Sequence, residues 1–377
     1  MVDYEKIKKN MNRCEEDLAE YASFSKDAIR DFDESDKDFR NEYERDVDKI
    51  IYSLSFTRYI DKTQVYSLRY NDNISRRMTH VQYVSRISRT IARALKLNED
   101  LCEAIALGHD IGHVPYGHEG EYILNDISKE KMGRCFAHNL QSVRDLYVVE
   151  NNGKGINLSL QTLDGIMAHN GEILQDEYRP IFDKTKQGFL LEYEMCFADD
   201  SNIKKIRPMT LEGCVVRISD IISYIGRDIE DAIRLGFLKY EDIPSDILEV
   251  LGTNNSEIIN TVINDVVENS YGKDYIKMSQ EVYDAMIKLK KFNSENIYKK
   301  SMTDEDRCVL REKFKFLYDT YIEAINNKYL DNSIYKDFLN YMDEKYLRNT
   351  QDGIKVIDFI AGMTDNYFER EYKKYSK

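Results

Sequence analysis

Histidine is concentrated in one part of this chain. All six histidines lie between residues 80 and 169, and three of them share the segment Gly-His-Asp-Ile-Gly-His-Val-Pro-Tyr-Gly-His at 108–118. Imidazole is a ligand for divalent transition metals and the side chain that most often transfers protons near neutral pH. This concentration therefore predicts a metal site, a proton-transfer site, or both.

His109 and Asp110 place an imidazole and a carboxylate on adjacent residues, a donor pair suited to a divalent cation. Two adjacent ligands do not hold a metal alone. The apolar spacing predicts a helix over residues 81–96, with His80 in its first turn on the same face as Val84. A histidine on that face is buried and needs a polar partner, so it is either a satisfied core residue or a further ligand. Arg77 lies within one turn of His80 and could reach the same pocket.

A fourth ligand could come from a helix predicted over residues 211–235. Its isoleucines and valines form one face, while Asp220, Tyr224 and Asp228 recur at four-residue intervals on the opposite face. Periodicity alone leaves two interpretations open. The polar stripe is either solvated, or it supplies a carboxylate ligand followed by contacts to a bound molecule.

Other histidines are candidates for proton transfer. His118 and Glu121 are three residues apart, so on a helix the carboxylate could orient the imidazole and raise its basicity. His138 is a second acid or base candidate. His113 follows His109 by four residues, but the intervening residues do not match a zinc-protease helix. His169 is expected to be a structural turn residue.

Helical periodicity extends over nearly the whole chain, and strand-like alternation is weak, so we predict an all-α fold. Residues 150–160 and 175–210 are expected to be loops or irregular insertions, and the apolar segment 357–367 is expected to pack back on the body. We expect three parts that form one body. They are an acidic, helical N-terminal extension (1–39), a core (40–240) and a helical C-terminal region (241–377).

Composition limits the partners. Apolar residues make up 42% of the chain, enough for a substantial core, and the net charge of −14 argues against stable binding to nucleic acid or an anionic membrane. No run approaches the ~18–20 apolar residues of a membrane span. The six cysteines are scattered, without a Cys-x-x-Cys pair, and the first residues lack the apolar core of a signal peptide. We therefore expect a cytoplasmic protein with reduced thiols.

The order of these residues resembles a known superfamily. Arg77-Met-Thr-His80, His109-Asp110 and Asp220 are similar to the His, His-Asp, Asp signature of the HD metal-dependent phosphohydrolases. The likeness is closest to the deoxynucleoside triphosphate triphosphohydrolases of the dGTPase-like branch. It runs in order through the segments 45–53, 62–65, 108–118, 161–166, 228–232 and 360–365. It implies a helical HD-domain bundle with a helical C-terminal extension packed on it.

The resemblance also implies roles for individual residues. A divalent metal, Mn or Mg or another transition metal such as Fe, Co, Ni or Zn, would be held by His80, His109, Asp110 and Asp220. The substrate-binding residues it implies are Arg77 for phosphate, Gln64 for the deoxyribose hydroxyl, and Tyr224 and Asp228 for the sugar.

The reaction implied by the resemblance is attack of a metal-activated water on the α-phosphorus of a dNTP, with dGTP favoured, to release a deoxynucleoside and intact triphosphate. His118 with Glu121, and separately His138, would handle the proton for the leaving 5′-oxygen, and His113 belongs to the same catalytic group. The family resemblance also implies a homo-oligomer, and it leaves open whether an allosteric nucleotide is a further partner.

Two other functions compete with this one. The same site could act on a different nucleotide phosphate ester, although the Gly-Tyr-Pro and Glu-Asp elements of cyclic-dinucleotide and alarmone hydrolases do not accompany it. A regulator that senses dNTP without hydrolysing it would have been favoured by the loss of a metal ligand. All four ligand residues are present.

Overall fold

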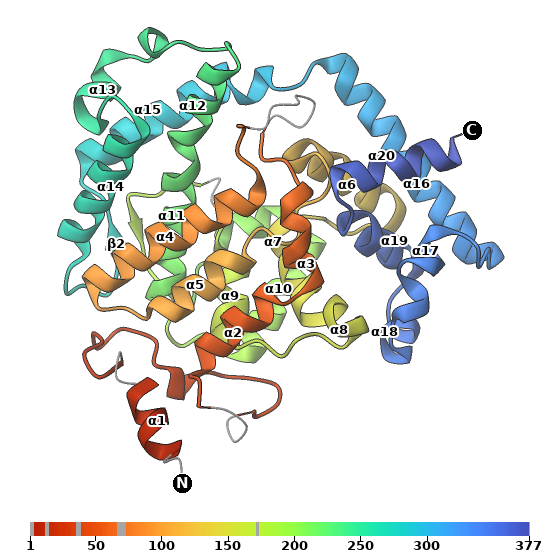
Figure 1. The fold of residues 1–377 in the computed structure, drawn as a ribbon, viewed down its shortest axis with the longest axis horizontal. Coiled ribbons are helices and arrows are strands. Elements are labelled where there is room, and N and C mark those ends of the chain that lie inside the picture. Colours follow the sequence, from red (N-terminus) through yellow and green to blue (C-terminus); the bar gives the residue numbers. More distant parts are fainter. Residues whose placement is uncertain (1–3, 12–14, 35–38, 66–72, 171–172, 377) are drawn as a thin grey trace.

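The computed structural model describes residues 4–11, 15–34, 39–65, 73–170 and 173–376 (Figure 1). Within these ranges the protein is built of helices, with one short antiparallel sheet in which β1 (Glu177–Tyr178) pairs with β2 (Ile276–Lys277). The prediction of an all-α fold is confirmed.

The α-helices divide into long packing helices and short connecting ones. In chain order they are α1 (Tyr4–Met11), α2 (Glu42–Ile51), α3 (Leu54–Thr57), α4 (Arg77–Leu95), α5 (Glu99–Gly108), α6 (Gly117–Met132), α7 (His138–Arg144), α8 (Glu150–Gly153), α9 (Leu160–Ala168), α10 (Lys186–Ala198), α11 (Leu211–Ile225), α12 (Arg227–Arg234), α13 (Ser245–Leu251), α14 (Asn255–Ser270), α15 (Gln280–Asn296), α16 (Asp304–Asn327), α17 (Ser333–Lys336), α18 (Glu344–Asn349), α19 (Asp352–Ala361) and α20 (Asp365–Tyr375). Single turns of 3-10 or π-helix join several of them, as at Tyr298–Lys300 and Asp145–Val149.

The first apolar core is formed where α4, α5, α9 and α11 pack together, with α2 against α5. The apolar face of α4 is buried as its spacing predicts, and His80 is buried on it beside Val84. The helix predicted over 211–235 is instead two helices that meet at Gly226. A Cβ at Gly226 would lie 2.4 Å from the side-chain oxygen Oδ1 of Asn255, so the start of α14 packs closely against this break.

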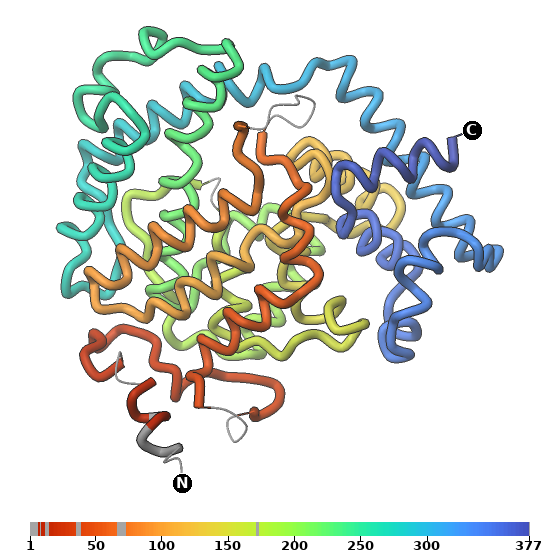
Figure 2. The backbone as a smooth tube through the Cα atoms, viewed as in Figure 1, coloured from red at the N-terminus to blue at the C-terminus, as the bar shows by residue number. Residues whose placement is uncertain are grey.

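A second apolar core lies between α6, α16, α19 and α20, on the right of Figure 1. Ile357, Phe359 and Ile360 are buried in it, which confirms that the segment 357–367 packs back on the body. Figure 2 shows the last part of the chain, in dark blue, returning to this core, where α19 packs against α6 and α20 against α16. The division at residue 240 proposed from the sequence falls within the first core, because α14 packs against α4 and α11.

The prediction of irregular structure for residues 175–210 is wrong near the start of the segment, which forms the strand β1, and in its middle part, which forms α10. The buried side chains of α10 include Phe189, Tyr193 and Phe197, which recur at helical spacing. Leu191 and Met195 lie on its exposed side. The helix therefore carries apolar residues on both its buried and its exposed side. Its sequence lacks the amphipathic pattern that predicts a surface helix. The prediction of irregular structure for residues 150–160 is correct only for residues 154–159, because Glu150–Gly153 forms α8 and Leu160 begins α9.

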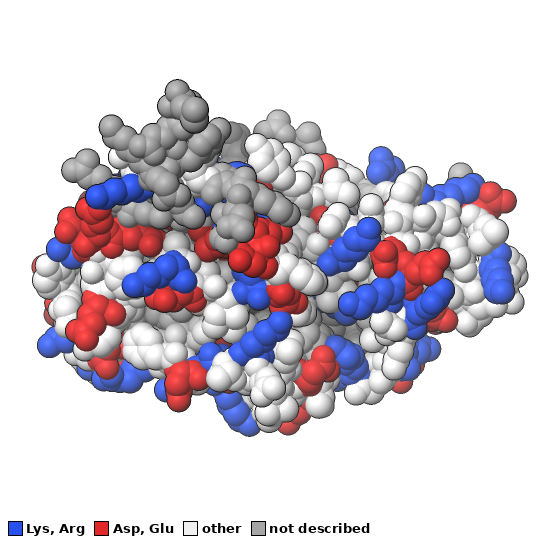
Figure 3. Space-filling model, turned by 90° about the horizontal axis from the view of Figure 1, so that it is seen from below, with Lys and Arg blue, Asp and Glu red and all other residues white. Residues whose placement is uncertain are grey.

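The described surface carries charges of both signs. On the face seen in Figure 3, basic and acidic side chains are interspersed rather than gathered into one large basic patch. Among the described residues, no helix combines the length and apolar character needed to cross a membrane. The cysteines that the structure describes are free thiols, namely Cys102, Cys135, Cys196, Cys214 and Cys308.

Candidate metal and proton-transfer site

The loop between α5 and α6 carries the first histidines of the site, and its shape depends on Gly112. A Cβ at Gly112 would lie 2.2 Å from the backbone nitrogen of Ser142 and 2.4 Å from the carbonyl oxygen of His138, so only glycine lets α7 approach. The Gly112 N–H donates to Ser142 Oγ at 2.9 Å, and that hydroxyl donates to the carbonyl oxygen of His109 at 2.6 Å. This contact brings the start of α7 against the loop that carries Asp110.

Four side chains converge from α4, the end of α5 and α11. His80 Nε2 lies 3.1 Å from Asp220 Oδ1 and 3.6 Å from Asp110 Oδ2. His109 Nε2 lies 3.4 Å from Asp110 Oδ1 and 3.7 Å from Asp220 Oδ1. All four side chains are buried or nearly so. The structure therefore brings together the four residues expected to bind metal, and we call His80, His109, Asp110 and Asp220 the metal cluster.

Hydrogen bonds at the far side of each ring fix how the two histidines face this cluster. His109 Nδ1 donates to the carbonyl oxygen of Ala106 at 2.7 Å, and His80 Nδ1 lies 3.2 Å from Ser223 Oγ. That hydroxyl donates to the Asp220 carbonyl oxygen, so it accepts from the His80 ring. Both imidazoles then present Nε2 to the carboxylates, and His109 Nε2 is buried without a hydrogen-bond partner. This is the arrangement by which proteins orient metal-binding histidines.

The electrostatics of the metal cluster favour ionised carboxylates. Burial alone would raise the pKa of Asp220, but the hydrogen bond to His80 and the charge of His109 lower it to about 2. Burial would likewise raise the pKa of Asp110, and His109, His113 and Arg77 hold it well below its usual range. Two anionic oxygens and two imidazole nitrogens, one of them the orphaned Nε2 of His109, form a donor set that fits a divalent cation.

Arg77, the first residue of α4, contacts the metal cluster, and it meets the backbone of Gln64 at the start of α6. Arg77 Nη1 donates to Asp110 Oδ2 at 2.5 Å, and the side chain is only 1% exposed. Its Nε and Nη2, and Oε1 of Gln64, are buried without hydrogen-bond partners. A Cβ at Gly117 would lie 3.2 Å from Arg77 Nη2 and 3.3 Å from the Gln64 carbonyl oxygen. The Arg77 guanidinium and the Gln64 backbone therefore both lie next to Gly117. Buried unpaired groups of this kind are suited to a polar ligand.

The segment that carries Gln64 is fixed by its neighbours. Lys62 is buried, and its ammonium group donates to the carbonyl oxygens of His113 and, at 3.2 Å, Ala361. Asp365 accepts from the Thr63 hydroxyl at 2.6 Å and from the Tyr116 N–H at 3.0 Å. The C-terminal helices α19 and α20 thus hold both the Gln64 segment and the loop before α6.

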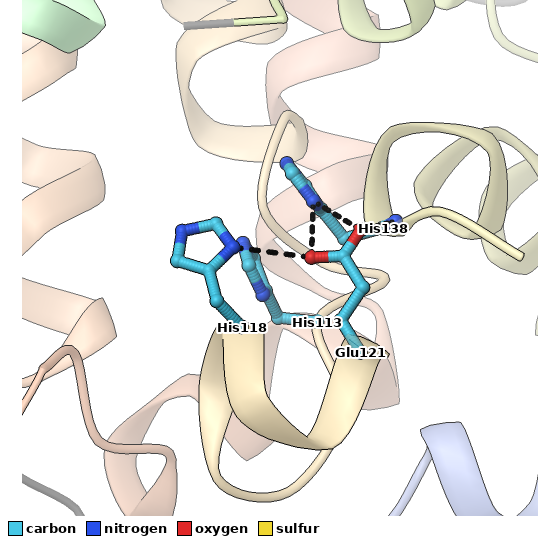
Figure 4. A group of neighbouring side chains, drawn as sticks. All are labelled: His113, His118, Glu121 and His138. Carbon is cyan, nitrogen blue, oxygen red and sulfur yellow. Dashed lines mark hydrogen bonds and ion pairs between the residues drawn. The ribbon is translucent and has the colours of Figure 1, made fainter. Parts of the chain in front are cut away.

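A second group, His113, His118, Glu121 and His138, lies next to the metal cluster, and we call it the relay cluster (Figure 4). Glu121 lies between two imidazoles, with Oε2 3.1 Å from His118 Nδ1 and Oε1 2.8 Å from His138 Nδ1. The His118 side chain is 48% exposed, whereas that of Glu121 is 11% exposed. His113 stacks on His138 at 3.9 Å between ring centroids, and its Nε2 lies 3.2 Å from Asp110 Oδ1.

The relay cluster contains an anion and a neutral imidazole. Burial alone would raise the pKa of Glu121, but His138 and His118 hold it well below its ordinary range. Burial, Arg77 and His138 lower the pKa of His113 far below its usual range, so its ring is neutral. His118 therefore has a carboxylate behind it and an accessible ring, as the sequence predicted for a proton-transfer pair.

His169 is not the structural turn residue that the sequence suggested. It follows α9, is buried, and faces the site, with Nε2 3.1 Å from His138 Nε2 and its ring 4.8 Å from that of His109. Its position depends on the packing of α9 against α5 and α7. Sequence spacing could not show this, although the clustering of all six histidines was a signal that included it.

The polar stripe of α11 and α12 is largely buried, so the interpretation as a solvated face is wrong for Asp220 and Asp228. Tyr224 is half-buried, one helical turn beyond Asp220. Tyr298, which the sequence did not single out, donates to Asp228 Oδ2 at 2.8 Å. Burial, opposed by this hydrogen bond, raises the pKa of Asp228 to about 7, and His80 and His118 lie within electrostatic reach of it.

Comparison with known proteins identifies the class of this fold and site. Residues 77–225 match the HD domain family, and residues 276–374 match the phosphohydrolase-associated domain family. The HD match begins at Arg77 and ends just beyond Tyr224, so it spans the whole metal cluster and relay cluster. The protein is a helical HD-domain protein whose site supports metal-dependent hydrolysis of a nucleotide phosphate.

Similar proteins identify the family within the HD-domain class. A deoxyguanosinetriphosphate triphosphohydrolase-like protein of Caldanaerobacter subterraneus subsp. tengcongensis is 39% identical over 95% of this chain and 91% of its own length. Proteins of the same name from Clostridium perfringens (38% identical; 98% and 97% covered) and Rickettsia bellii (30%; 95% and 97%) are also similar. The chain belongs to this deoxyguanosinetriphosphate triphosphohydrolase-like family.

Proposed function

We propose that this protein hydrolyses deoxynucleoside triphosphates at the α-phosphorus, releasing a deoxynucleoside and intact triphosphate. The observation that carries the proposal is the buried Arg77, which is tied to Asp110 of the metal cluster through Nη1 while Nε and Nη2 are unpaired. A guanidinium with two unpaired donors beside a metal cluster is suited to phosphate oxygens. The names of the relatives supply the nucleotide class.

The metal cluster is the proposed holder of the divalent cation. His80 and His109 would bind through Nε2, and Asp110 and Asp220 through carboxylate oxygens, since each histidine is tied at Nδ1. A cation there supplies Lewis acidity at the phosphate and makes water a stronger nucleophile. Mn and Mg are the proposed ions, and the imidazole ligands also suit Fe, Co, Ni or Zn.

His118 is the proposed proton donor. In the reaction, a water oxygen forms a bond to the α-phosphorus, the bond from that phosphorus to the 5′-oxygen breaks, and the 5′-oxygen receives a proton. His118 is the exposed ring of the relay cluster and has the Glu121 carboxylate 3.1 Å behind it, which stabilises its protonated form. His138 bonds to the other side of Glu121, and we propose that it and His113 position the carboxylate and Asp110.

Recognition of the sugar is assigned to three residues. The unpaired Oε1 of Gln64 can accept a hydrogen bond from a deoxyribose hydroxyl. Asp228, held by Tyr298, offers a further hydrogen-bonding group, and the half-buried ring of Tyr224 lies between Asp220 and Asp228 along the chain. We propose that this ring leaves no room for a 2′-hydroxyl and so disfavours ribonucleotides.

The test is product analysis by anion exchange after incubating the purified protein with Mn²⁺ or Mg²⁺ and each dNTP, each NTP, and all four dNTPs together. The proposal expects deoxynucleoside and triphosphate in equal amounts. Asp246→Asn, which changes an exposed carboxylate paired with Lys288, is the matched control for variants of the site.

Each other outcome has a distinct meaning. Nucleoside monophosphate or diphosphate as the product would place cleavage at another phosphorus and reject the proposal. Binding of dNTP without any product would favour a nucleotide-sensing regulator, and activity only on another phosphate ester would favour the alternative hydrolase. Activity that appears only in the mixture would reveal an activating nucleotide. The homo-oligomer and the cytoplasmic location also stay predictions, the first testable by light scattering with and without dNTP.

A further inference from the structure

We propose that Asp365, the first residue of α20, is a positioning residue that fixes the sugar-binding residue Gln64 relative to the proton donor His118. Residues 360–365 form one of the segments that resemble the dGTPase-like branch, and the hydrolysis proposed above gives them no role. The partly buried carboxylate of Asp365 accepts hydrogen bonds from two separate segments of the site. This inference rests on the proposed function, from which the roles of Gln64 and His118 are taken.

One carboxylate oxygen of Asp365 holds the segment that carries Gln64. Oδ2 accepts from the Thr63 hydroxyl at 2.6 Å and from the Thr63 N–H at 3.3 Å. Thr63 also pairs with Arg76 in an isolated antiparallel bridge, which joins this segment to the start of α4. A shift of Thr63 would therefore move Gln64, the next residue, relative to Arg77 of the phosphate site.

The other carboxylate oxygen holds the turn before α6. Oδ1 accepts from the Tyr116 N–H at 3.0 Å. Tyr116 has a φ of 64°, a left-handed conformation that is unfavourable for a residue with a side chain and persists where neighbouring groups hold it. The Tyr116 hydroxyl donates to Glu369, one helical turn further along α20. The helix α20 thus holds Tyr116 by its backbone and by its side chain, two residues before His118.

The two segments that Asp365 holds meet at Gly117. A Cβ at this residue would lie 3.3 Å from the Gln64 carbonyl oxygen and 3.2 Å from Arg77 Nη2. Gly117 begins α6, and His118 follows it. A single carboxylate has a fixed distance between its oxygens, so the two sets of hydrogen bonds together fix the spacing of the segments.

The helix α20 is itself anchored in the second apolar core. Phe368 is buried, and its ring lies 4.4 Å from that of Phe314 and 5.7 Å from that of Tyr116, between centroids. Lys313 of α16 donates to Glu369 at 2.7 Å. The C-terminal region therefore supplies a rigid support from which Asp365 reaches both segments.

The competing interpretation is that Asp365 only stabilises α20, since a carboxylate is favourable in the first turn of any helix. Glu371 provides a matched control for this interpretation. It lies on the same helix, is buried, and accepts from the Tyr321 hydroxyl at 2.9 Å within the second core. Its loss would weaken α20 without removing a contact to either segment of the site.

Hydrogen/deuterium exchange of the full-length protein, followed by mass spectrometry, tests the positioning directly. Asp365→Asn replaces one acceptor oxygen by an NH₂ group, so exchange is expected to become several-fold faster in the peptides that contain Thr63 and Tyr116. Glu371→Gln is expected to leave both peptides unchanged. Unchanged exchange in Asp365→Asn, or equal changes in the two variants, would overturn the proposal.

Kinetics with a pair of substrates tests the link to sugar recognition. Each dNTP is compared with its 2′,3′-dideoxy analogue, which lacks the hydroxyl that Gln64 is proposed to bind. Asp365→Asn is expected to lower the preference for dNTP in kcat/KM by about tenfold, the effect of one hydrogen bond. Its kcat is expected to fall by about 10–10²-fold, because the proton donor is misplaced. Glu371→Gln should change neither quantity.

Thr63 provides a second pair of variants. Thr63→Val removes the hydroxyl that donates to Asp365 and is expected to lower the dNTP preference, and Thr63→Ser, which keeps the hydroxyl, is expected to restore it. This pair decides the proposal if Asp365→Asn does not fold. A preference that is unchanged in Asp365→Asn and Thr63→Val, or absent in the wild-type protein, would overturn the proposal.

The two experiments also separate this inference from the proposed function. A wild-type protein that hydrolyses no dNTP would reject the proposed function. The exchange experiment uses no nucleotide, so it would still decide whether Asp365 holds the two segments.

Discussion

The metal cluster and the relay cluster use the same side-chain types but differ in burial and support. In the metal cluster, the side chains of His80 and His109 are 4% and 1% exposed, and each ring is tied behind by a hydrogen bond. In the relay cluster, the side chain of His118 is 48% exposed and lies at the start of α6. The comparison separates rings that are held in one geometry from a ring that is open to solvent, as the proposed proton donor has to be.

The two clusters also depend on different parts of the fold. The metal cluster is built on α4, α5 and α11, which pack in the first apolar core. The relay cluster is built partly on α6, whose buried face packs against α16 and α19 in the second core. The C-terminal region therefore packs more directly against the relay cluster than against the metal cluster.

The largest effect is expected from the metal cluster. Asp110→Asn removes an anionic ligand and the charge partner of Arg77, so we expect loss of the metal and of hydrolysis to background. Elemental analysis and the product assay measure both. Retention of metal at wild-type occupancy would remove Asp110 from the ligand set, and Asp246→Asn controls for loss of a carboxylate elsewhere.

In the relay cluster, His118→Gln should separate chemistry from metal binding. Removal of the proposed proton donor is expected to lower kcat by about 10²–10⁴-fold while the metal content stays unchanged. Steady-state kinetics with parallel elemental analysis checks this. An unchanged kcat would exclude His118 as the donor.

A smaller effect on metal binding is expected from a change at Ser223, which contacts the His80 ring on the side away from the carboxylates. Its hydroxyl accepts from His80 Nδ1, so Ser223→Ala should loosen the ring and weaken metal affinity by about 10–100-fold. Titration of the metal-free protein with Mn²⁺ measures the affinity. Because the variant keeps all four ligands, excess metal should restore kcat, and failure of that rescue would argue against a role in orienting His80.

A substitution in the second apolar core is the counterpart of Ser223→Ala for the relay cluster. Phe314 of α16 is buried, and its ring lies 3.1 Å from where a Cβ on Gly120 would be, next to Glu121. Phe314→Leu removes the ring from this contact and is expected to lower kcat a few-fold, at a stability cost of about 1–2 kcal/mol, without changing metal affinity. A loss of metal affinity as large as that in Ser223→Ala would remove the proposed difference between the clusters.

The last prediction concerns stability rather than rate. The buried Asp228 has its pKa raised to about 7 in the folded protein, against about 3.9 in an unfolded chain. Between pH 4 and pH 7 the folded state binds the additional proton, so the free energy of unfolding falls as pH rises through this window, by on the order of 2–4 kcal/mol from this group. Asp228→Asn should lack that fall. Urea unfolding at pH 4.5 and 7.5 compares the two proteins, and parallel pH profiles would contradict the assignment.

Much of the metal cluster could be predicted from local pattern, because His80 lies on an amphipathic helix and His109 and Asp110 are adjacent. Residues placed by long-range packing could not. His169 reaches the site only because α9 packs against α5 and α7, and Tyr298 reaches Asp228 from 70 residues away. The pattern of α10 does not identify a helix, because apolar residues such as Leu191 also lie on its exposed side. The apolar spacing of residues 211–235 likewise continues through Gly226 and gives no sign of the break there.

The central claim is that water attacks the α-phosphorus at a site built around the metal cluster and Arg77. Hydrolysis of a dNTP in ¹⁸O-labelled water, followed by mass spectrometry of the products, tests it most directly. The account predicts the label in the triphosphate and none in the 5′-hydroxyl of the deoxynucleoside. Label in the deoxynucleoside, or in phosphate or pyrophosphate formed as a first product, would contradict it.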